Sequence, residues 1–269
     1  MKKLLPILLL ISCFSLTSCE EEIVLDLDKN VPRLVIEGNL FVDESLYNNI
    51  HLSTTTDFYS NVFPSVNDAQ VSIKDLTNNV DYPFTNIGKG DFSNTDFRPK
   101  TDNQYELTVV YKNEIYKATS TLLESPEITN IEQKNDGGFD GDTYEFRFYF
   151  QDNPDQENYY LVQMRSPKDH AFGTLSDQFT NGNLMSDLYF YDKEDVKPGN
   201  QLRYAINSIS KDYYNYLGKL LSISGEMSNP FASPMGTIKG NIINQTNETN
   251  FALGYFHIAQ RNHYTYIVK

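Results

Sequence analysis

The chain has 269 residues, a formal net charge of −14, and 19 tyrosines and 17 phenylalanines without a single tryptophan. That charge repels nucleic acid and no basic stripe offsets it, so we expect no nucleic-acid partner. Cys13 and Cys19 are the only cysteines. Two cysteines allow at most one disulfide, so a fold held together by several disulfides is excluded, and the aromatic residues favour a β-rich core.

The first residues predict a secretory precursor. Lys2 and Lys3 precede an almost wholly apolar run, Leu4–Leu16. As a helix this run would rise only about 20 Å, which is too short to cross a bilayer core of roughly 30 Å. Its length and its basic flank are typical of a signal peptide rather than of a transmembrane anchor.

The run ends in Leu16-Thr17-Ser18-Cys19, which resembles the lipobox cleaved by the lipoprotein signal peptidase. We therefore expect residues 1–18 to be a lipoprotein signal peptide and Cys19 to be the first mature residue and the lipidation site. Two or three acyl chains on one cysteine attach a protein stably to a membrane. The alternatives are a conventional secretion signal that leaves Cys19 as a free thiol, and a Cys13–Cys19 disulfide.

Acidic residues follow the cysteine directly, at Glu20, Glu21 and Glu22. Loss of the two signal-peptide lysines takes the net charge from −14 to −16. We interpret residues 19–29 as an acidic tether, which does not itself favour anionic lipid. The three glutamates resemble the export signal of Bacteroidota lipoproteins and predict the outer face of the outer membrane. A plain solvated tether is the alternative.

Residues 30–123 predict a first β-sandwich. About seven short stretches alternate between apolar and polar residues, with turn residues between them at regular spacing, as in Ala69–Leu76 and Tyr105–Tyr111. Lys112-Asn113 fits a two-residue hairpin turn with positive backbone angles. Asp91–Lys100 is expected to be a polar connection.

A linker around Glu124–Glu127 leads to a second β-rich module, residues 126–269. Its strongest alternating strand is Tyr144–Phe150, for which we expect Tyr159–Arg165 as the partner. Residues 166–200 are predicted to be mostly loops, with an aromatic stretch at Leu188–Tyr191. A helix is expected near residues 210–222, capped by Ser208 or Ser210. Phe251–Gln260 is predicted as the last strand, with Gly254 at a close backbone approach or a bulge.

The predicted fold class is thus all-β, with two immunoglobulin- or fibronectin-like β-sandwich modules, the second carrying one short helix. The tyrosine-rich segments Tyr189–Tyr191 and Tyr213–Tyr216 could meet a ligand or partner. Packing in the core is the favoured interpretation of both.

A search of the sequence for catalytic patterns finds none. The four histidines have no metal-ligand spacing, and there is no nucleophile elbow and no phosphate-binding glycine loop. The turn at Asn135–Asp142 offers carboxylates to a calcium ion through Asp136, Asp140 and Asp142, although a solvated hairpin turn is the favoured interpretation. A second acidic turn holds Asp152, Asp155 and Glu157, for which we expect a structural role.

Across the mature chain, an ordered series of short motifs resembles the Bacteroidota lipoprotein family defined by a domain of unknown function, DUF4249. The motifs are Leu34-Val-Ile-Glu-Gly38, Ala69-Gln-Val-Ser-Ile73, Tyr105-Glu-Leu-Thr-Val109, Tyr116–Leu122, Asn158-Tyr-Tyr-Leu161, Ser208–Tyr214, Asn229-Pro-Phe231, Gly240-Asn-Ile242 and Ala252-Leu-Gly-Tyr-Phe256. The resemblance implies a gene near a TonB-dependent outer-membrane transporter. No enzymatic activity is established for that family, and no functional residues are defined there that could be carried over.

From these observations we expect a non-enzymatic, surface-exposed lipoprotein that assists a TonB-dependent transporter in capturing or delivering a nutrient. We expect no cofactor beyond the lipid on Cys19. A structural or adhesive envelope protein is the first alternative. A glycan-active hydrolase is the second, and it would need two carboxylates brought together in space.

Overall fold

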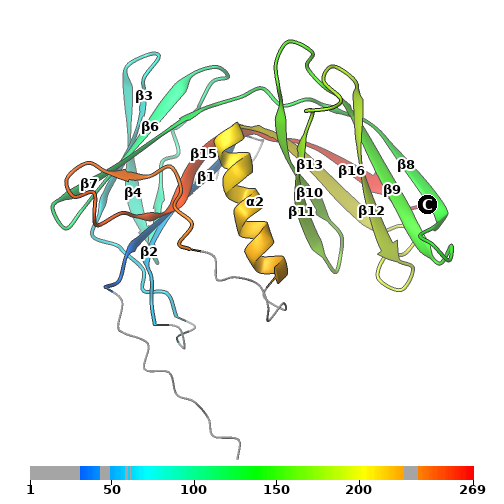
Figure 1. Ribbon diagram of the computed structural model, residues 1–269, viewed down its shortest axis with the longest axis horizontal. Helices are drawn as coiled ribbons and strands as arrows, with labels where there is room; N and C mark the ends of the chain where they lie inside the picture. Colours follow the sequence, from blue (N-terminus) through cyan, green and yellow to red (C-terminus); the bar gives the residue numbers. More distant parts are fainter. Residues whose placement is uncertain (1–30, 43–48, 58–59, 61, 227–235) are drawn as a thin grey trace, which may run out of the picture. The chain divides into compact units, whose positions relative to one another are not determined.

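In the computed structural model, residues 31–42, 49–57, 60, 62–226 and 236–269 are described. The chain separates into two units, Met1–Val31 and Pro32–Lys269, and the second holds every strand that is described. Figure 1 shows these elements, whose bounds are β1 Leu34–Val42, β2 Asn49–Thr54, β3 Gln70–Asp75, β4 Val80–Gly88, β5 Asp91–Ser93, β6 Gln104–Tyr111, β7 Glu114–Thr121, β8 Ile128–Gly137, β9 Thr143–Gln151, β10 Tyr159–Arg165, β11 His170–Ser176, β12 Leu184–Asp192, β13 Gln201–Ile209, α2 Lys211–Glu226, β14 Ile243–Asn244, β15 Leu253–Gln260 and β16 Asn262–Ile267.

The first module is a nine-stranded sheet with the order β14-β7-β6-β3-β4-β5-β2-β1-β15. The sheet folds over on itself, since β15 at one edge also contacts β7 near the other, where Leu123 and Ala259 form a parallel bridge. Alternating side chains of its strands, such as Leu107 and Val109, fill one enclosed core. The structure has seven strands before residue 123, which agrees with the predicted number of about seven, although β5 was expected to be a connection. Lys112 and Asn113 take the positive φ angles of 49° and 63° that a two-residue turn requires.

The second module is a sandwich of a three-stranded sheet, β12-β9-β8, and a four-stranded sheet, β11-β10-β13-β16. Phe146, Phe148 and Phe150 of β9 face Tyr160 of β10 and Tyr204 of β13 across a fully buried aromatic core. Such side chains bury a large apolar area and prefer edge-on or offset ring contacts. The predicted all-β class with two sandwich-like modules and one helix is confirmed.

One prediction of strand pairing in this module was wrong. Tyr144–Phe150 and Tyr159–Arg165 do not pair, because β9 pairs with β8 and β12, whereas β10 pairs with β11 and β13. The two strands instead lie in opposite sheets, with their apolar faces meeting in the core. Residues 166–200 contain two strands that the sequence did not predict, β11 and β12, with loops between and around them. In the first module, the short strand β5 begins the expected polar connection 91–100.

The expected division at residues 123–126 does not hold for the whole chain. The connection between β13 and β16 of the second sandwich contains α2, β14 and β15, and both of these strands belong to the sheet of the first module. β15 pairs in parallel with β1, from Val35 opposite Leu253 to Val42 opposite Gln260, and Figure 1 shows the two strands side by side. The last strand is therefore β16, and β15 completes the first module.

The helix begins where the sequence predicts it, with Ser210 at its cap. The Ser210 side-chain oxygen accepts a hydrogen bond from Tyr213 N at 3.2 Å, and its carbonyl accepts one from Tyr214 N at 2.9 Å. Tyr213 and Leu217 then face a small core formed with Tyr159 and Leu161 of β10, Ile209 of β13 and Tyr255 of β15. One helix thus buries its apolar stripe against strands of both modules.

Candidate functional site

The sites expected near the amino terminus, Cys19 and the export residues Glu20, Glu21 and Glu22, lie outside the described residues. Among the residues that are described, no helix is long and apolar enough to span a membrane.

The proposed calcium turn comprises the end of β8, with Asp136, and the connection to β9, with Asp140 and Asp142. Asp136, Asp140 and Asp142 are all exposed there, and Lys193 Nζ approaches the Gly141 carbonyl at 3.2 Å. Within the described part of the chain, no three His, Cys, Asp or Glu side chains gather as a metal ion would require. Gly138 and Gly141 take positive φ angles of 77° and 70°, so the conformation follows the hairpin-turn interpretation.

The histidines have separate local roles. His51 Nδ1 lies 2.8 Å from the Asp91 carboxylate across the β2–β5 pair. His170 begins β11 rather than lying in a loop. His257 is 2% exposed and stacks on the Tyr213 ring at 4.2 Å, and its Nε2 has no partner among the described residues. Burial lowers the pKa of His257 to about 3, so the ring is neutral.

Ser125, in the linker, connects the second module to the end of β15. Its buried hydroxyl donates to the Gln260 carbonyl at 2.7 Å and accepts from Ser208 N at 2.7 Å. Asn262 Nδ2 donates to the Ser125 carbonyl at 2.7 Å. The sequence identified Glu124–Glu127 only as a linker, since a Ser-Pro pair in a polar stretch carries no signal of burial.

Beside this linker lies a groove of about 800 Å³. Its lining is polar and carries five carboxylates and one lysine, at Asp102, Glu124, Glu127, Asp152, Glu157 and Lys211. Hydrogen bonds from Tyr159 and Lys211 hold the pKa of Glu157 below its usual value, so this carboxylate is ionised at neutral pH. A second groove of about 860 Å³ lies on the other side of Glu127 and contains Arg261 and His263.

Two carboxylates here are buried: Asp152, in the lining of the first groove, and Asp177, which is not part of that lining. Asp152 accepts a hydrogen bond from the Tyr160 hydroxyl and one from Gly182 N at 2.7 Å. Asp177 accepts from Asn158 N at 2.8 Å and is fully buried. Burial, and then the charge of Asp152, raises the pKa of Asp177, although the Asn158 hydrogen bond opposes this. Both carboxylates hold the turn 152–158 against the loop before β12, which agrees with the structural role expected for Asp152.

The family model for a domain of unknown function (DUF4249) matches residues 20–265, which is nearly the whole chain. The chain belongs to this family. The resemblance read from the motifs is thereby confirmed at the level of the DUF4249 domain. No curated protein matches the sequence.

Solved structures similar to this DUF4249 chain include fibronectin type III domains. Chicken CNTN1 FN1–FN3 is 10% identical over 68% of this chain and 62% of that one, with a TM-score of 0.25. A two-domain fibronectin type III segment of chicken tenascin is 8% identical over 66% and 91%, with a TM-score of 0.21. The chicken interferon gamma receptor alpha chain is 8% identical over 66% and 88%, with a TM-score of 0.22. The chain thus spans less than two thirds of the CNTN1 segment.

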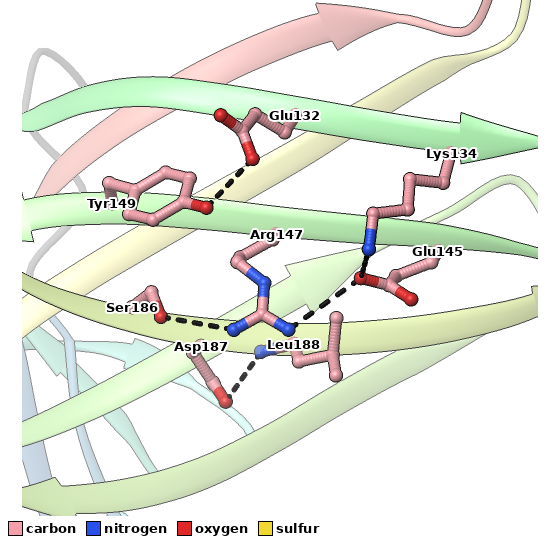
Figure 2. A network of polar contacts seen from close by, with 8 residues as sticks. All are labelled: Glu132, Lys134, Glu145, Arg147, Tyr149, Ser186, Asp187 and Leu188. Atoms are coloured by element: carbon pink, nitrogen blue, oxygen red, sulfur yellow. Dashed lines mark hydrogen bonds and ion pairs between the residues drawn. The ribbon is translucent and has the colours of Figure 1, made fainter. Parts of the chain in front are cut away.

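The outer face of the β12-β9-β8 sheet carries a polar network (Figure 2). Tyr149 donates to Glu132 at 2.7 Å, which raises the pKa of its phenol. Glu145 lies 3.1 Å from Lys134 and 3.6 Å from Arg147, which also approaches Ser186 at 3.5 Å. The charges of Lys134, Glu145 and Arg147 are paired with one another, whereas Glu132 is bound by a neutral phenol. Exposed pairs of this kind contribute little to stability.

The aromatic stretch in β12 serves mainly the core. Tyr191 is 7% exposed, and Tyr189 packs against the core of the second module and stacks on Phe148. Phe190 is on the opposite side and is half exposed. Tyr213 is buried, and Tyr214 and Tyr216 are partly buried against the helix core. For these residues the packing interpretation is therefore correct, except at Phe190.

Proposed function

We propose that the mature DUF4249 chain is a non-enzymatic lipoprotein, anchored to the outer membrane through Cys19 and facing the cell exterior. Its role is to assist a TonB-dependent transporter in capturing or delivering a nutrient. The observation that carries this proposal is the lipobox Leu16–Cys19 with Glu20, Glu21 and Glu22 directly after it. The family resemblance connects such lipoproteins with those transporters.

The geometry around the linker Glu124–Glu127 supports a binding role. The groove beside the linker is open, polar and rich in carboxylates, and Lys211 is paired with Glu157 at 3.2 Å. Such a lining repels anions and suits a cationic ligand or an uncharged one with many hydroxyl groups. Ser125 and the shared helix core hold the two modules together around it, which pre-organises the groove and lowers the cost of ordering on binding.

The anchor is tested by metabolic labelling with a fatty acid. The wild-type chain is expected to incorporate label and to remain with the outer-membrane fraction, whereas Cys19→Ser is expected to do neither. Cys13→Ser is the matched control, because Cys13 lies within the apolar run that is removed. Equal labelling of wild type and Cys19→Ser would exclude this lipidation site.

The export signal is tested by protease treatment of intact cells. The triple variant Glu20→Ala, Glu21→Ala and Glu22→Ala is expected to keep its lipid but to become protected from external protease. Asp26→Ala with Asp28→Ala removes two acidic residues further along the tether; it is the control for loss of negative charge and should stay accessible.

The transporter partnership is tested by affinity purification of the tagged, lipidated chain from solubilised outer membranes. A TonB-dependent transporter is expected in the eluate. Its absence, with the protein intact and correctly localised, would remove the transport role and favour the structural or adhesive alternative.

A further inference from the structure

One end of the first module carries exposed apolar side chains that serve no core. Val62 and Phe63, in the connection between β2 and β3, are 73% and 65% exposed, and Ile87 in β4 is 61% exposed. Scattered apolar residues on a surface are ordinary, but a group of them marks an interaction site.

Backbone contacts bring these residues together. Thr54 N donates to the Pro64 carbonyl at 2.9 Å, which places Phe63 beside the end of β2. Leu52 N donates to the Gly90 carbonyl at 2.8 Å, and a Cβ on Gly90 would lie 3.3 Å from Ser65. The β4–β5 turn, with Ile87 before it and Lys89 in it, therefore lies against the same connection.

This end is also where the chain enters β1 from the amino-terminal segment. Thr55 N donates to the Arg33 carbonyl at 2.9 Å, and Arg33 N donates to the Thr55 hydroxyl at 2.9 Å. Arg33 lies fourteen positions after Cys19. They span about 50 Å at most when fully extended. A lipid on Cys19 would therefore keep this end within that distance of the bilayer.

Three cations accompany the apolar residues. The Arg33 guanidinium and the Lys239 ammonium lie 3.7 Å and 3.9 Å from the centre of the Phe251 ring, and Lys89 is exposed in the turn. None of the three forms an ion pair with another described residue. Asp57 and Asp68 are nearby in the chain and exposed, so apolar contact and not net charge must supply most of the attraction.

We propose that this end of the first module docks on the surface of the bilayer that holds Cys19. Val62, Phe63 and Ile87 enter the boundary between headgroups and acyl chains, and Arg33, Lys89 and Lys239 meet the lipid phosphates. The inference rests on the lipid anchor of the proposed function. Its consequence is that the module is held against the membrane in one orientation and does not swing freely on the tether.

The absence of tryptophan from the chain gives a clean test. Phe63→Trp introduces the sole tryptophan at the docking end. The lipidated, full-length mature variant is reconstituted into vesicles of phosphatidylcholine and phosphatidylglycerol, with or without brominated acyl chains. We expect its emission to shift to shorter wavelength and to lose intensity with the brominated lipid. Phe179→Trp is the matched control, since Phe179 is 90% exposed in the second module, and it should show neither effect.

Adding Val62→Glu to the Phe63→Trp chain should restore most of the tryptophan emission that the brominated lipid quenches. The circular dichroism spectrum should not change, because Val62 supports no core. Flotation of the vesicles separates the two proposals. A protein that floats while Phe63→Trp is no more quenched than Phe179→Trp overturns the docking and leaves the anchor standing. A protein that does not float overturns the anchor, and the docking falls with it.

Discussion

Ser125 shows how one small side chain connects parts of the fold that are distant in sequence. Its hydroxyl bridges the Gln260 carbonyl and Ser208 N, both at 2.7 Å, and the residue is 4% exposed. Ser125→Ala leaves a buried donor and a buried acceptor unsatisfied, so we expect the free energy of unfolding to fall by about 1–3 kcal/mol. Urea titration measures this. Ser222→Ala, on the exposed face of α2, is the control and should change it by less than about 0.5 kcal/mol. Equal effects would show that the Ser125 bridge contributes nothing.

His257 gives the fold a dependence on pH. Its pKa in the folded state is lowered to about 3 by burial, from an ordinary value of 6.5. Between these values the unfolded chain binds a proton that the folded chain does not, so stability falls as the pH falls from about 6.5 towards 3. The loss from this group approaches roughly 1.4 kcal/mol for each pH unit well below 6.5.

The comparison that checks this is wild type against His257→Phe, melted at pH 7 and at pH 5. His257→Phe should lose less stability than wild type between the two values, since the carboxylates titrate alike in both. His263→Phe, a partly exposed position on β16, should behave as wild type. An equal loss in wild type and His257→Phe would contradict the buried neutral state of the ring.

At the scale of the element, the pairing of β1 with β15 depends on Gly254. Its φ is +93°, and a Cβ at that position would lie 2.0 Å from the Ile36 carbonyl oxygen. Gly254→Ala therefore combines about 1–3 kcal/mol of backbone strain with a clash against a buried strand. We expect the variant to be destabilised by at least that amount, or to fail to fold.

Gly218 in α2 is the matched control for that substitution. Nothing lies within 4 Å of a Cβ placed there, so Gly218→Ala should stabilise the chain by up to about 1 kcal/mol through helix propensity. Thermal melting of both variants checks the pair. If the two alanines had the same effect, the close approach at Ile36 would not be what requires glycine.

At the scale of the whole molecule, the two modules share their parts. The connection between β13 and β16 supplies β14 and β15 to the first sheet, and Ile242, Ala252, Phe256 and Ile258 lie in the first core. Neither module is therefore complete as a continuous stretch of chain. We expect residues 32–269 to unfold in one cooperative transition, with equal calorimetric and van't Hoff enthalpies. Two resolved transitions would contradict this.

A truncated chain ending at Leu123 tests the same point. It keeps β1–β7 but lacks the strand that pairs with β1. The exposed strand edge and the incomplete core should leave it aggregated or sensitive to protease. A truncated chain that folds as stably as the whole protein would show that β15 is dispensable.

Sequence patterns located most strands and the helix, because alternation and capping are local properties. Tyr105–Tyr111 and Ser210 with α2 are examples. Patterns failed at β11, where His-Ala-Phe-Gly-Thr-Leu-Ser has no regular alternation. They also failed for the partner of β9, since alternation shows which face of a strand is buried but not which strand lies beside it.

The candidate sites also divide into those that the sequence predicts and those that it does not. Cys19 and its glutamates are a linear signal, so the sequence alone predicts them. The glycines and aspartates of Asn135–Asp142 likewise predict a turn, and β8 and β9 pair on either side of it. The groove was not predictable, because its carboxylates at Asp102, Glu127 and Asp152 come from separate loops. With 36 acidic residues in the chain, no pattern could have chosen them.

The sequence by itself determined the all-β class, the family and the helix, because each depends on residues close together along the chain or on the order of short motifs. Only the tertiary structure decided that β15 returns to β1, that Ser125 joins the linker to both modules, and that Pro64 and Arg33 both bond to the end of β2. These relations join residues far apart in the chain. The chain adopts them because this arrangement buries the apolar faces of the strands and also forms the backbone hydrogen bonds.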